Sequence, residues 1–438
     1  MVFPLPYYII EPFLSFDSKL KKCVLKIILF RDTSVIQSTD VCIKIIYKNN
    51  SMKKANLILT GLAISFITIY GCKKENFNSL AGSTSSNNLS DGSFERRGQE
   101  GKGAVYIMDN AVSGNNIVMY DRDNDGQLTP SGIFPTGGTG KGSGLGSQGS
   151  LIIEGDYLFA CNPGSNEISV LKTTKSGLTL IHKVSSNGMN PVSVTVHDDL
   201  LYVLNSGGTG NISGFRIMPN FHLNYIQNSA RPLSSSSAGA AQVEFNHSGN
   251  QLVVTEKATN NILTYEVDNS GLTGNAIVHA SVGATPFGFE FGKNNVLIVS
   301  DAFGGAAGQS ALTSYSLNNN GNINLITGPV ATTQTAACWV VVTKDGKYCY
   351  TTNTGSGNVS GYNIGNNGEL SLLDANGITG ITGAGPIDMS LSKNSKFLYT
   401  LNGAGHSISM FRVNNNGSLM FLGDIPGLLV GSVGMAAE

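Results

Sequence analysis

One motif recurs along this chain from residue 104 to its end. A short apolar strand ending in a polar residue is followed by a Gly-rich or polar loop, a second strand, a tight polar turn and a further short segment. The first strands of the copies are VYIMDN, YLFACN, LYVLNS, LVVTEK, LIVSDA, YCYTTN and FLYTLN. From Tyr106 to Tyr399 the seven copies recur at an average spacing of about 49 residues. This period, with several strands in each copy, indicates the blades of a β-propeller.

A further strand precedes the motif in the second to seventh copies, as in SLIIEGD and PVSVTVHDD, but not in the first copy. The last eight residues of the chain, GSVGMAAE, resemble these segments and have nothing after them. We expect them to form the innermost strand of the first blade, which closes the ring and removes its open edges. The predicted fold is therefore all-β: a seven-bladed β-propeller with four-stranded blades, closed by the C-terminal strand.

Composition supports this fold and limits the partners. The 54 glycines fit many turns between short strands. Only 13% of the residues are charged and the formal net charge is −1, so no basic patch is available to hold nucleic acid. We expect no nucleic-acid partner.

The segment SMKKANLILTGLAISFITIYGCKKEN has the features of an export signal. Two lysines follow Met52, residues 55–70 carry no charge, and Gly71 precedes Cys72. A basic start, an apolar stretch shorter than the roughly 18–20 residues of a membrane span and a small residue before the cleavage point are typical of a secretory signal peptide. The residues before Cys72 resemble the lipobox of bacterial lipoproteins, in which the cysteine is lipidated. A buried apolar helix is the structural alternative.

The expected organisation follows from this segment. Residues 52–71 form the lipoprotein signal peptide, and residues 1–51 are interpreted as an upstream extension from a mis-assigned translation start. Residues 72–103 are rich in Ser, Asn and Gly and too poor in apolar residues to offset their ordering entropy, so we expect a flexible tether. Residues 104–438 form the propeller. This predicts an envelope protein, anchored to the membrane through lipid on Cys72 and facing the periplasm or the cell surface.

The stretch DRDNDGQ at residues 121–127 resembles the start of an EF-hand calcium loop. Asp121, Asp123 and Asp125 alternate before Gly126, but position 12 of such a loop needs a bidentate Glu and here is Gly132. In the other copies the same place is held by turns such as VDNSGL and VNNNGSL, whose Asn, Asp and Gly residues tolerate positive φ. We interpret the stretch as a hairpin turn. No histidines have zinc-ligand spacing, and we expect no metal and no cofactor.

Functional residues are expected on the long loops. In a four-stranded blade, the loops that lead into the innermost strand and those between the second and third strands share one face, here called the loop face. The tight turns share the opposite face, here called the turn face. Because binding residues concentrate on long, varied loops, the channel mouth on the loop face is the expected site.

The pattern in AAQVEFNHSGNQLVVTEKATNNILTYEVDNSGLTG resembles the seven-bladed propellers grouped with 6-phosphogluconolactonase and carboxymuconate cyclase, and the resemblance covers residues 104–438. Catalytic members of that family combine an Arg and a His at the start of an inner strand, a Glu at the end of the next strand, and a His-x-His pair. By this resemblance Glu256 matches the Glu. The Arg and His positions fall on Ala241 and Gln242, and the His pair falls on residues 146–150, which contain no histidine.

Glu256 is therefore the candidate catalytic residue, as a base in lactone opening or closure. A solvated or salt-bridged carboxylate is the structural alternative. The candidate binding partners on the same face are Lys257, Asp301, Gln334, Arg231 and His406.

Other recurring residues are interpreted as structural. Asparagines end the second strands in four copies, and we expect their amides to hold the following loop. Around the turn in ACWVVVTKDGKYCY, Cys349 should lie opposite Val342 and not Cys338, so free buried thiols are expected. Trp339 either lines the channel or packs between blades.

Two function classes remain open. The first is an enzyme resembling the lactonases or cyclases, acting on a small carbohydrate or carboxylate ligand such as a lactone. The second is a non-catalytic propeller that binds a glycan, a peptide or a protein partner through the loop face. Fold alone does not decide between them.

Overall fold

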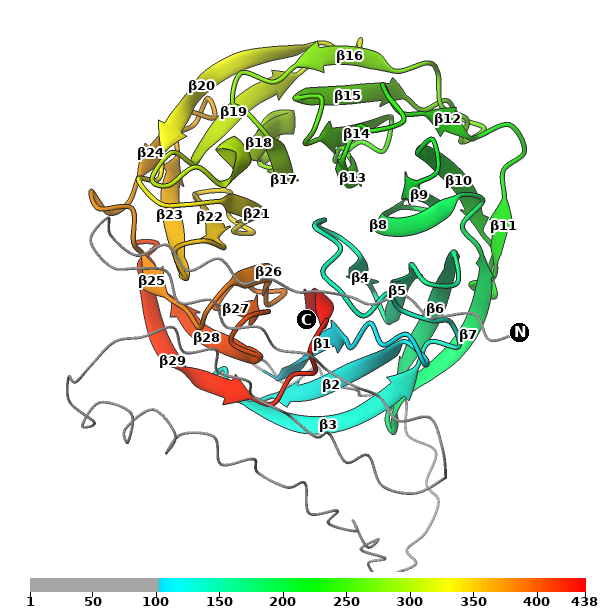
Figure 1. Ribbon diagram of the computed structural model, residues 1–438, viewed down its shortest axis with the longest axis horizontal. Coiled ribbons are helices and arrows are strands. Elements are labelled where there is room, and N and C mark those ends of the chain that lie inside the picture. Colours follow the sequence, from blue (N-terminus) through cyan, green and yellow to red (C-terminus); the bar gives the residue numbers. More distant parts are fainter. Residues whose placement is uncertain (1–101) are drawn as a thin grey trace, which may run out of the picture. The chain divides into compact units, whose positions relative to one another are not determined.

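The structure, a computed structural model, describes residues 102–438. The expected signal peptide and Cys72 lie outside these residues. Strands of the described part form seven antiparallel sheets around a common centre (Figure 1). The predicted all-β, seven-bladed propeller is confirmed.

Each blade has an innermost strand beside the channel and a second strand paired with it. The innermost strands are β30 (Val433–Ala437), β4 (Leu151–Glu154), β8 (Met189–His197), β13 (Ala240–Phe245), β17 (Pro286–Phe291), β21 (Ala337–Val342) and β26 (Pro386–Leu391). The second strands are β1 (Gly103–Met108), β5 (Tyr157–Asn162), β9 (Leu200–Gly207), β14 (Gln251–Glu256), β18 (Val296–Asp301), β22 (Tyr348–Asn353) and β27 (Phe397–Asn402).

The third and outer strands complete the blades. The third strands are β2 (Asn116–Arg122), β6 (Glu167–Thr174), β10 (Asn211–Ile217), β15 (Asn261–Glu266), β19 (Ala311–Leu317), β23 (Asn358–Ile364) and β28 (Ser407–Val413). The outer strands are β3 (Leu128–Pro135), β7 (Gly177–Ser185), β11 (Leu223–Tyr225), β16 (Ile277–Ala280), β20 (Ile323–Ala331), β24 (Leu370–Leu372) and β29 (Leu419–Pro426). Short outer strands β12 (Arg231–Pro232) and β25 (Gly380–Ile381) and 3-10 turns η1 (Lys293–Asn295) and η2 (Phe303–Gly305) are added to this plan.

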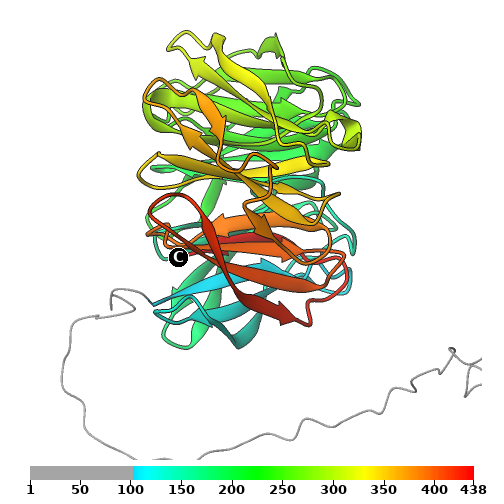
Figure 2. The ribbon, with the colours of Figure 1, turned by 90° about the vertical axis from the view of Figure 1, so that its left-hand side faces the viewer.

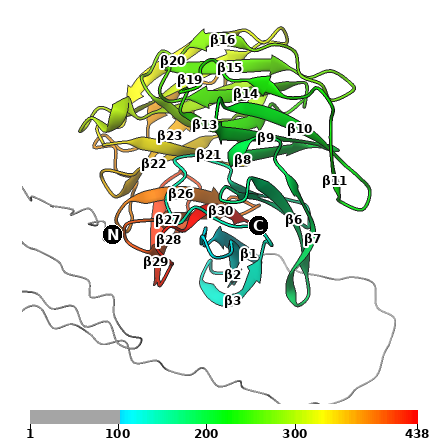
Figure 3. The same ribbon diagram turned by 45° about the vertical axis from the view of Figure 1, so that its right-hand side comes forward.

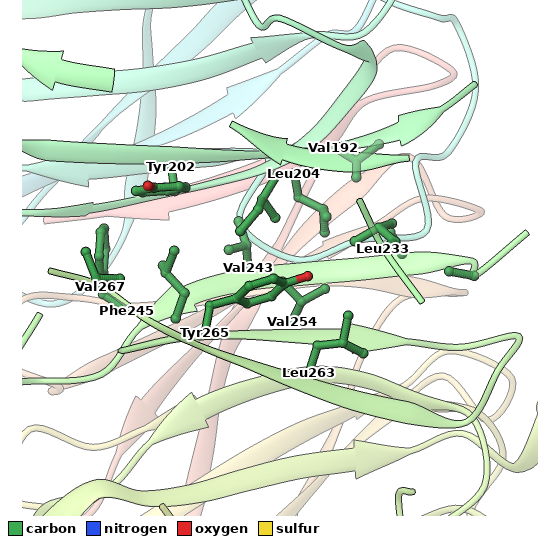
Figure 4. Close-up of a cluster of buried hydrophobic side chains, with 14 residues drawn as sticks. Val192, Tyr202, Leu204, Leu233, Val243, Phe245, Val254, Leu263, Tyr265 and Val267 are labelled. Carbon is green, nitrogen blue, oxygen red and sulfur yellow. The ribbon is translucent and has the colours of Figure 1, made fainter. Parts of the chain in front are cut away.

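The core lies between neighbouring blades, seen edge-on in Figure 2. Between the sheets of β8 and β13, Tyr202, Leu204, Val243 and Tyr265 belong to one fully buried cluster (Figure 4). Every second residue of a strand contributes its side chain to this layer, because successive residues of a strand point to opposite faces of the sheet. Burying each large apolar side chain contributes about 1.5–3 kcal/mol, so each blade is stabilised chiefly by its two neighbours.

Tyrosine hydroxyls join several neighbouring blades at the turn face. Tyr202 donates to the carbonyl oxygen of Gly271 at 2.6 Å, and Tyr350 donates to that of Gly417 at 2.8 Å. In both pairs the tyrosine lies on a second strand, and the glycine lies in the turn between the third strand and the outer strand of the next blade. The recurring tyrosines of the second strands therefore position the neighbouring turn as well as fill the core.

The ring closes through the C-terminal strand, as predicted. β30 pairs with β1, with Tyr106 opposite Ala436 (Figure 3). Asp388 of β26 also accepts a hydrogen bond from the backbone N–H of Met435 at 3.1 Å. The last strand thus connects the seventh blade to the first.

The DRDNDGQ turn takes part in the same closure. Its Gly126 has a φ of +88°, and an added Cβ would lie 2.3 Å from the ring of Phe397 in the seventh blade, so only glycine fits there. Asp123 accepts hydrogen bonds from the backbone N–H groups of its own turn, Asp121 accepts one from Ser131, and Asp125 lies 3.5 Å from Arg412. The three carboxylates have separate partners, and no group of three or more His, Cys, Asp or Glu side chains that could hold a metal occurs in residues 102–438.

Candidate functional site

A cavity of about 450 Å³ occupies the centre of the ring, and all seven innermost strands contribute to its wall. One end of the cavity is formed by Gln148, which is buried. The lining at the other end includes Glu154, an exposed residue at the tight turn after β4. The cavity therefore opens toward the turn face, whereas the sequence placed the expected site on the loop face.

The loop-face end of the channel is closed by residues 143–149, here called the plug. The side chain of Gln148 makes two hydrogen bonds to the backbone of Val340, donating to its carbonyl oxygen at 2.7 Å and accepting from its N–H at 2.9 Å. The backbone N–H of Gln148 donates to Ala241 at 3.1 Å. Gly288 permits this approach, because an added Cβ there would lie 2.2 Å from the Gln148 side-chain oxygen.

Two further side chains hold the plug. Trp339 donates from its indole Nε1 to the carbonyl oxygen of Ser147 at 3.1 Å and packs against Phe287 with ring centroids 4.9 Å apart. Lys257 donates from Nζ to the carbonyl oxygen of Gly146 and lies 4.6 Å above the Phe287 ring. Burial lowers the pKa of the Lys257 ammonium to about 8, although neighbouring Cys338 acts in the opposite direction. Trp339 is thus buried between blades and holds the plug, and it does not line the cavity.

Two carboxyl groups from adjacent blades meet in the wall of the cavity. Glu244 of β13 and Glu290 of β17 hydrogen-bond to each other, and both are partly exposed to the channel. Gln242 fixes Glu244 by donating to its Oε2 at 2.7 Å, and the backbone N–H of Phe291 donates to Glu290 Oε1 at 3.2 Å. This pair lies between the plug and the turn-face mouth.

The pKa values of both carboxyl groups are raised. Desolvation is the largest cause for each, and for Glu244 the negative charge of Glu290 adds to it. Two carboxyl groups in contact cannot both ionise easily, so the pair retains one proton above the pH at which a solvated Glu has lost it. One member is then a proton donor and the other a proton acceptor.

Two more acidic residues line the cavity, Asp388 on β26 and Glu154 at the mouth. Asp388 is buried, and burial raises the pKa of its carboxyl group although backbone N–H groups donate to it. Among the described residues that line the cavity, none is Lys, Arg or His. The channel is thus acidic and rich in hydrogen-bond acceptors.

The structure encloses Glu256 at the end of β14 with no exposed surface. Its carboxylate accepts hydrogen bonds from the Ser234 N–H at 2.9 Å, from the Ser234 hydroxyl and from the Thr259 hydroxyl at 2.6 Å. Glu256 does not line the cavity. In this arrangement it braces the loop before β13, and a ligand would reach it only if that loop moved.

The predicted partners of Glu256 have separate surroundings. Arg231 donates to backbone carbonyl oxygens, including that of Gly274 at 3.1 Å, and Gln334 donates to that of Asn376 at 2.9 Å. His406 is half-buried, with φ of +48° and a buried Nδ1 that makes no hydrogen bond. Within residues 102–438, no hydrogen bond or ion pair joins any two of the six candidates. Of these six described residues, Lys257 is the one that hydrogen-bonds to the plug.

Asp301 lies at the strand-end position that is asparagine in other blades. Asn353 and Asn402 each donate to a serine of the third strand at 2.8 Å, so their amides are structural but join the second and third strands across the loop that they were expected to hold. Asp301 accepts from Thr313 at 2.5 Å, and its other oxygen, Oδ1, is buried without a partner. Burial raises the pKa of Asp301 to about 8.

The cysteine predictions are also confirmed for the described residues. Cys161, Cys338 and Cys349 are free and buried, and Cys349 lies opposite Val342. In the same part of the chain, no helix is long and apolar enough to cross a membrane.

Glu244 and Glu290 were missed by the sequence reasoning. They lie in AQVEFNHSG and FGFEFGKN, segments that served only to define the innermost strands. An acidic residue flanked by apolar residues on a strand expected to be buried was the available signal, because an unpaired buried carboxylate is costly.

A model of the family described as "Lactonase, 7-bladed beta-propeller" matches residues 303–425, from η2 into β29. This chain resembles the seven-bladed lactonases. The match covers the fifth to seventh blades in part or whole, and the likeness to the lactonases predicted from sequence is thereby confirmed. No curated protein matches the sequence.

Solved structures extend the likeness to the lactonases at the level of the fold. A candidate 6-phosphogluconolactonase from Bacteroides fragilis is 17% identical with a TM-score of 0.61, covering 78% of this chain and 99% of its own. A second one, from Bacteroides uniformis, is 18% identical with a TM-score of 0.60, covering 77% and 99%. The periplasmic gluconolactonase of Pseudomonas aeruginosa is 15% identical with a TM-score of 0.60, covering 76% and 98%. At these identities the comparison establishes the propeller fold.

Proposed function

We propose that this protein hydrolyses a lactone in its central channel and that Glu244 and Glu290 act together as general acid and base. The observation that carries the proposal is the hydrogen-bonded carboxyl pair facing a cavity that is closed at one end. The similarity to lactonases supports the reaction class. Glu256 is not given this role because it does not line the cavity.

The reaction needs one proton to be taken and one to be given. The ionised member of the pair takes a proton from a water molecule whose oxygen adds to the lactone carbonyl carbon. The ring C–O bond then breaks, and the protonated member gives its proton to the departing ring oxygen, which becomes a hydroxyl. The product is a hydroxy acid, and the pair ends with one proton as it began.

Product release also follows from the acidic wall. The product acid then loses its carboxyl proton to solvent, and the resulting carboxylate lies in a cavity lined by Glu154, Asp388 and the ionised member of the Glu244–Glu290 pair. Like charges at short range repel strongly in a poorly solvated site, so the product is expelled toward the open turn face.

The test measures hydrolysis of D-glucono-1,5-lactone by the purified protein and by the variants Glu244→Gln and Glu290→Gln. We expect each variant to lose about 100-fold or more in kcat, the range typical of general acid–base groups. Glu266→Gln is the matched control, because Glu266 is exposed on β15 of the same blade as Glu244. Unchanged turnover in both pair variants would contradict the proposal. Loss of turnover in Glu256→Gln alone would return the chemistry to Glu256 and the loop face.

A second candidate function is binding through the loop face, to a glycan, a peptide or a protein. The observation that favours it is an exposed apolar group, in which Val112 is 69% and Val430 is 76% exposed on loops of this face. If no lactone is hydrolysed, glycan and peptide arrays probed with the wild-type protein and with Val430→Asp would test this function. Equal binding by both proteins would show that the exposed apolar group does not contact the ligand.

We also propose that the protein is exported and anchored through Cys72, on the basis of the signal-like segment before that residue. Mass spectrometry of the N-terminal peptide made in the native host should show a lipid on Cys72, and Cys72→Ala should release the protein from membranes. An unmodified N-terminus upstream of Met52 would contradict both the anchor and the expected translation start.

A further inference from the structure

We infer that the channel accepts lactones that carry hydroxyl groups but no anionic substituent, and excludes phosphorylated ones. This inference rests on the proposed function and names its substrate class. It starts from the charges of the wall. Four acidic side chains, Glu154, Glu244, Glu290 and Asp388, line one cavity of about 450 Å³ without a basic residue among the described lining residues.

A phosphate group needs several strong donors, and the channel offers few: the hydroxyls of Thr195 and Ser390 are neutral, and no basic group among the described lining residues accompanies them. The Gln148 amide nitrogen already donates to Val340, and the Gln242 amide nitrogen donates to Glu244 and, at 2.9 Å, to the carbonyl oxygen of Phe289. Phosphate sites in proteins are built from Arg, Lys or free backbone N–H groups. A phosphoryl group, with a charge of about −1.5 to −2 at neutral pH, would enter this cavity without a cationic partner from the described lining residues.

The basic groups closest in sequence to the acidic pair do not change this conclusion. His247 lies in the tight turn after β13, where its ring hydrogen-bonds to the carbonyl oxygen of Gly292 at 3.1 Å. It influences Glu290 but does not line the cavity. Lys293 is exposed in the next turn. These groups lie outside the cavity wall, so they cannot neutralise an anion bound within it.

Hydroxyl groups, in contrast, match the wall. A polyhydroxylated lactone brings many donors, and the carboxyl oxygens of Glu244, Glu290 and Asp388 are acceptors. The ionised member of the Glu244–Glu290 pair is a charged acceptor, and hydrogen bonds to charged acceptors are the stronger ones. Discrimination therefore has an attractive part, from hydroxyl donors, and a repulsive part, against anions.

The experiment compares kcat/KM for D-glucono-1,5-lactone and its 6-phosphate with the full-length protein. We expect the uncharged lactone to be preferred by at least about 100-fold. Equal or better use of the phosphorylated lactone would overturn the inference while leaving the proposed hydrolysis intact.

A variant at the mouth sharpens the comparison. Glu154→Lys should raise the ratio of kcat/KM for the phosphorylated lactone to that for the uncharged one by about tenfold, because it replaces repulsion by attraction. Glu266→Lys makes the same charge change outside the cavity and should leave the ratio within twofold. An equal rise of the ratio in both variants would show an effect of net charge and would contradict selection by the channel.

If neither lactone is opened, the proposed hydrolysis fails, and binding still decides the inference. Calorimetry with D-glucono-1,5-lactam, an unreactive uncharged analogue, and with gluconate 6-phosphate separates the two ligand classes. Binding of the lactam alone supports the inference. Tighter binding of the phosphorylated acid, or binding of neither ligand, overturns it.

Discussion

The hydroxyl of Tyr399 donates a hydrogen bond to the carbonyl oxygen of Gly126 at 2.9 Å, although 273 residues separate them in the chain. Tyr399 lies on β27 of the seventh blade, and Gly126 lies in the first blade's turn. The bond is buried. It is the same contact that Tyr202 and Tyr350 make between other neighbouring blades, and here it joins the seventh blade to the first.

Tyr399→Phe should lower the free energy of unfolding by about 1–3 kcal/mol, because the buried carbonyl oxygen of Gly126 loses its donor. Denaturant titration would measure this. Tyr265→Phe is a matched control, because Tyr265 is equally buried but its hydroxyl makes no hydrogen bond (Figure 4). An equal loss in both variants would show that the Tyr399 hydrogen bond is not the cause.

Removal of residues 431–438 should destabilise the whole ring. The deletion exposes the edge of β1 and removes the Asp388 contact to Met435. We expect the thermal midpoint to fall by about 10 °C, since about 2–4 °C per kcal/mol is typical of larger domains and several contacts are lost together. An unchanged midpoint would show that the C-terminal strand does not hold the ring.

Asp301→Asn should make stability less dependent on pH. Because burial raises the pKa of Asp301 to about 8, its contribution to stability is fully present below the unfolded pKa near 4. It is lost as the pH rises toward 8. Unfolding titrations at pH 5 and pH 8 should therefore show a smaller difference in the variant, which should also be more stable by about 1–3 kcal/mol at pH 8.

The control for this prediction is Asp156→Asn, a change of the same kind at an exposed side chain in the turn between β4 and β5. It should leave the pH dependence of stability unchanged. A wild-type protein that gains stability between pH 5 and 8 relative to Asp301→Asn would contradict the expected sign.

The rate of lactone hydrolysis should depend on pH in a bell shape. Activity needs one proton shared by Glu244 and Glu290, so it falls when both are protonated and when both are ionised. Raised pKa values place both limbs at higher pH than solvated glutamates would give. Glu290→Gln should remove the bell along with most of the rate. A wild-type profile that is flat from pH 4 to 9 would contradict the shared proton.

Gln148→Ala should loosen the plug. The backbone N–H and C=O of Val340 would both lose their hydrogen bonds to Gln148. Each group left buried and unpaired lowers the free energy of unfolding by about 1–3 kcal/mol. The thiol of Cys338, which is buried near Lys257, should then react faster with a thiol reagent. Gln127→Ala, an exposed glutamine in a turn, is the control. Identical labelling rates in all three proteins would show that the plug does not protect the channel.

The fold followed from the sequence because its determinants are local and repeated. Apolar strands and tight turns recur in each copy, and strand-end asparagines recur in four copies, so their shared role was visible. The pairing of Cys349 with Val342 followed from a single turn. The closure by residues 433–437 could be predicted because the first copy lacks an upstream strand, and the C-terminal strand is followed by no further copy.

The candidate site could not be derived in the same way. Glu244 and Glu290 are 46 positions apart, and they meet only because neighbouring blades place equivalent strand positions side by side in the channel. The segment around Gln148 is a Gly-rich loop, and composition does not say that a loop folds inward. Its partners, such as Val340, lie 192 residues away. Contacts across the ring depend on the assembled geometry, so no local sequence pattern predicts them.

The closure of the ring also has a consequence for where the chain is cut. Gly103 lies directly beside Glu438, because Val105 pairs with Ala437 in adjacent antiparallel strands. A short linker could join these two points, and new ends could be opened in an exposed tight turn, such as that at residues 344–347. Such a circular permutant would keep every blade and every inter-blade contact. The sixth blade, in place of the first, would then contain both the first and the last strand of the propeller. The position of the termini is thus separable from the way the ring is held together.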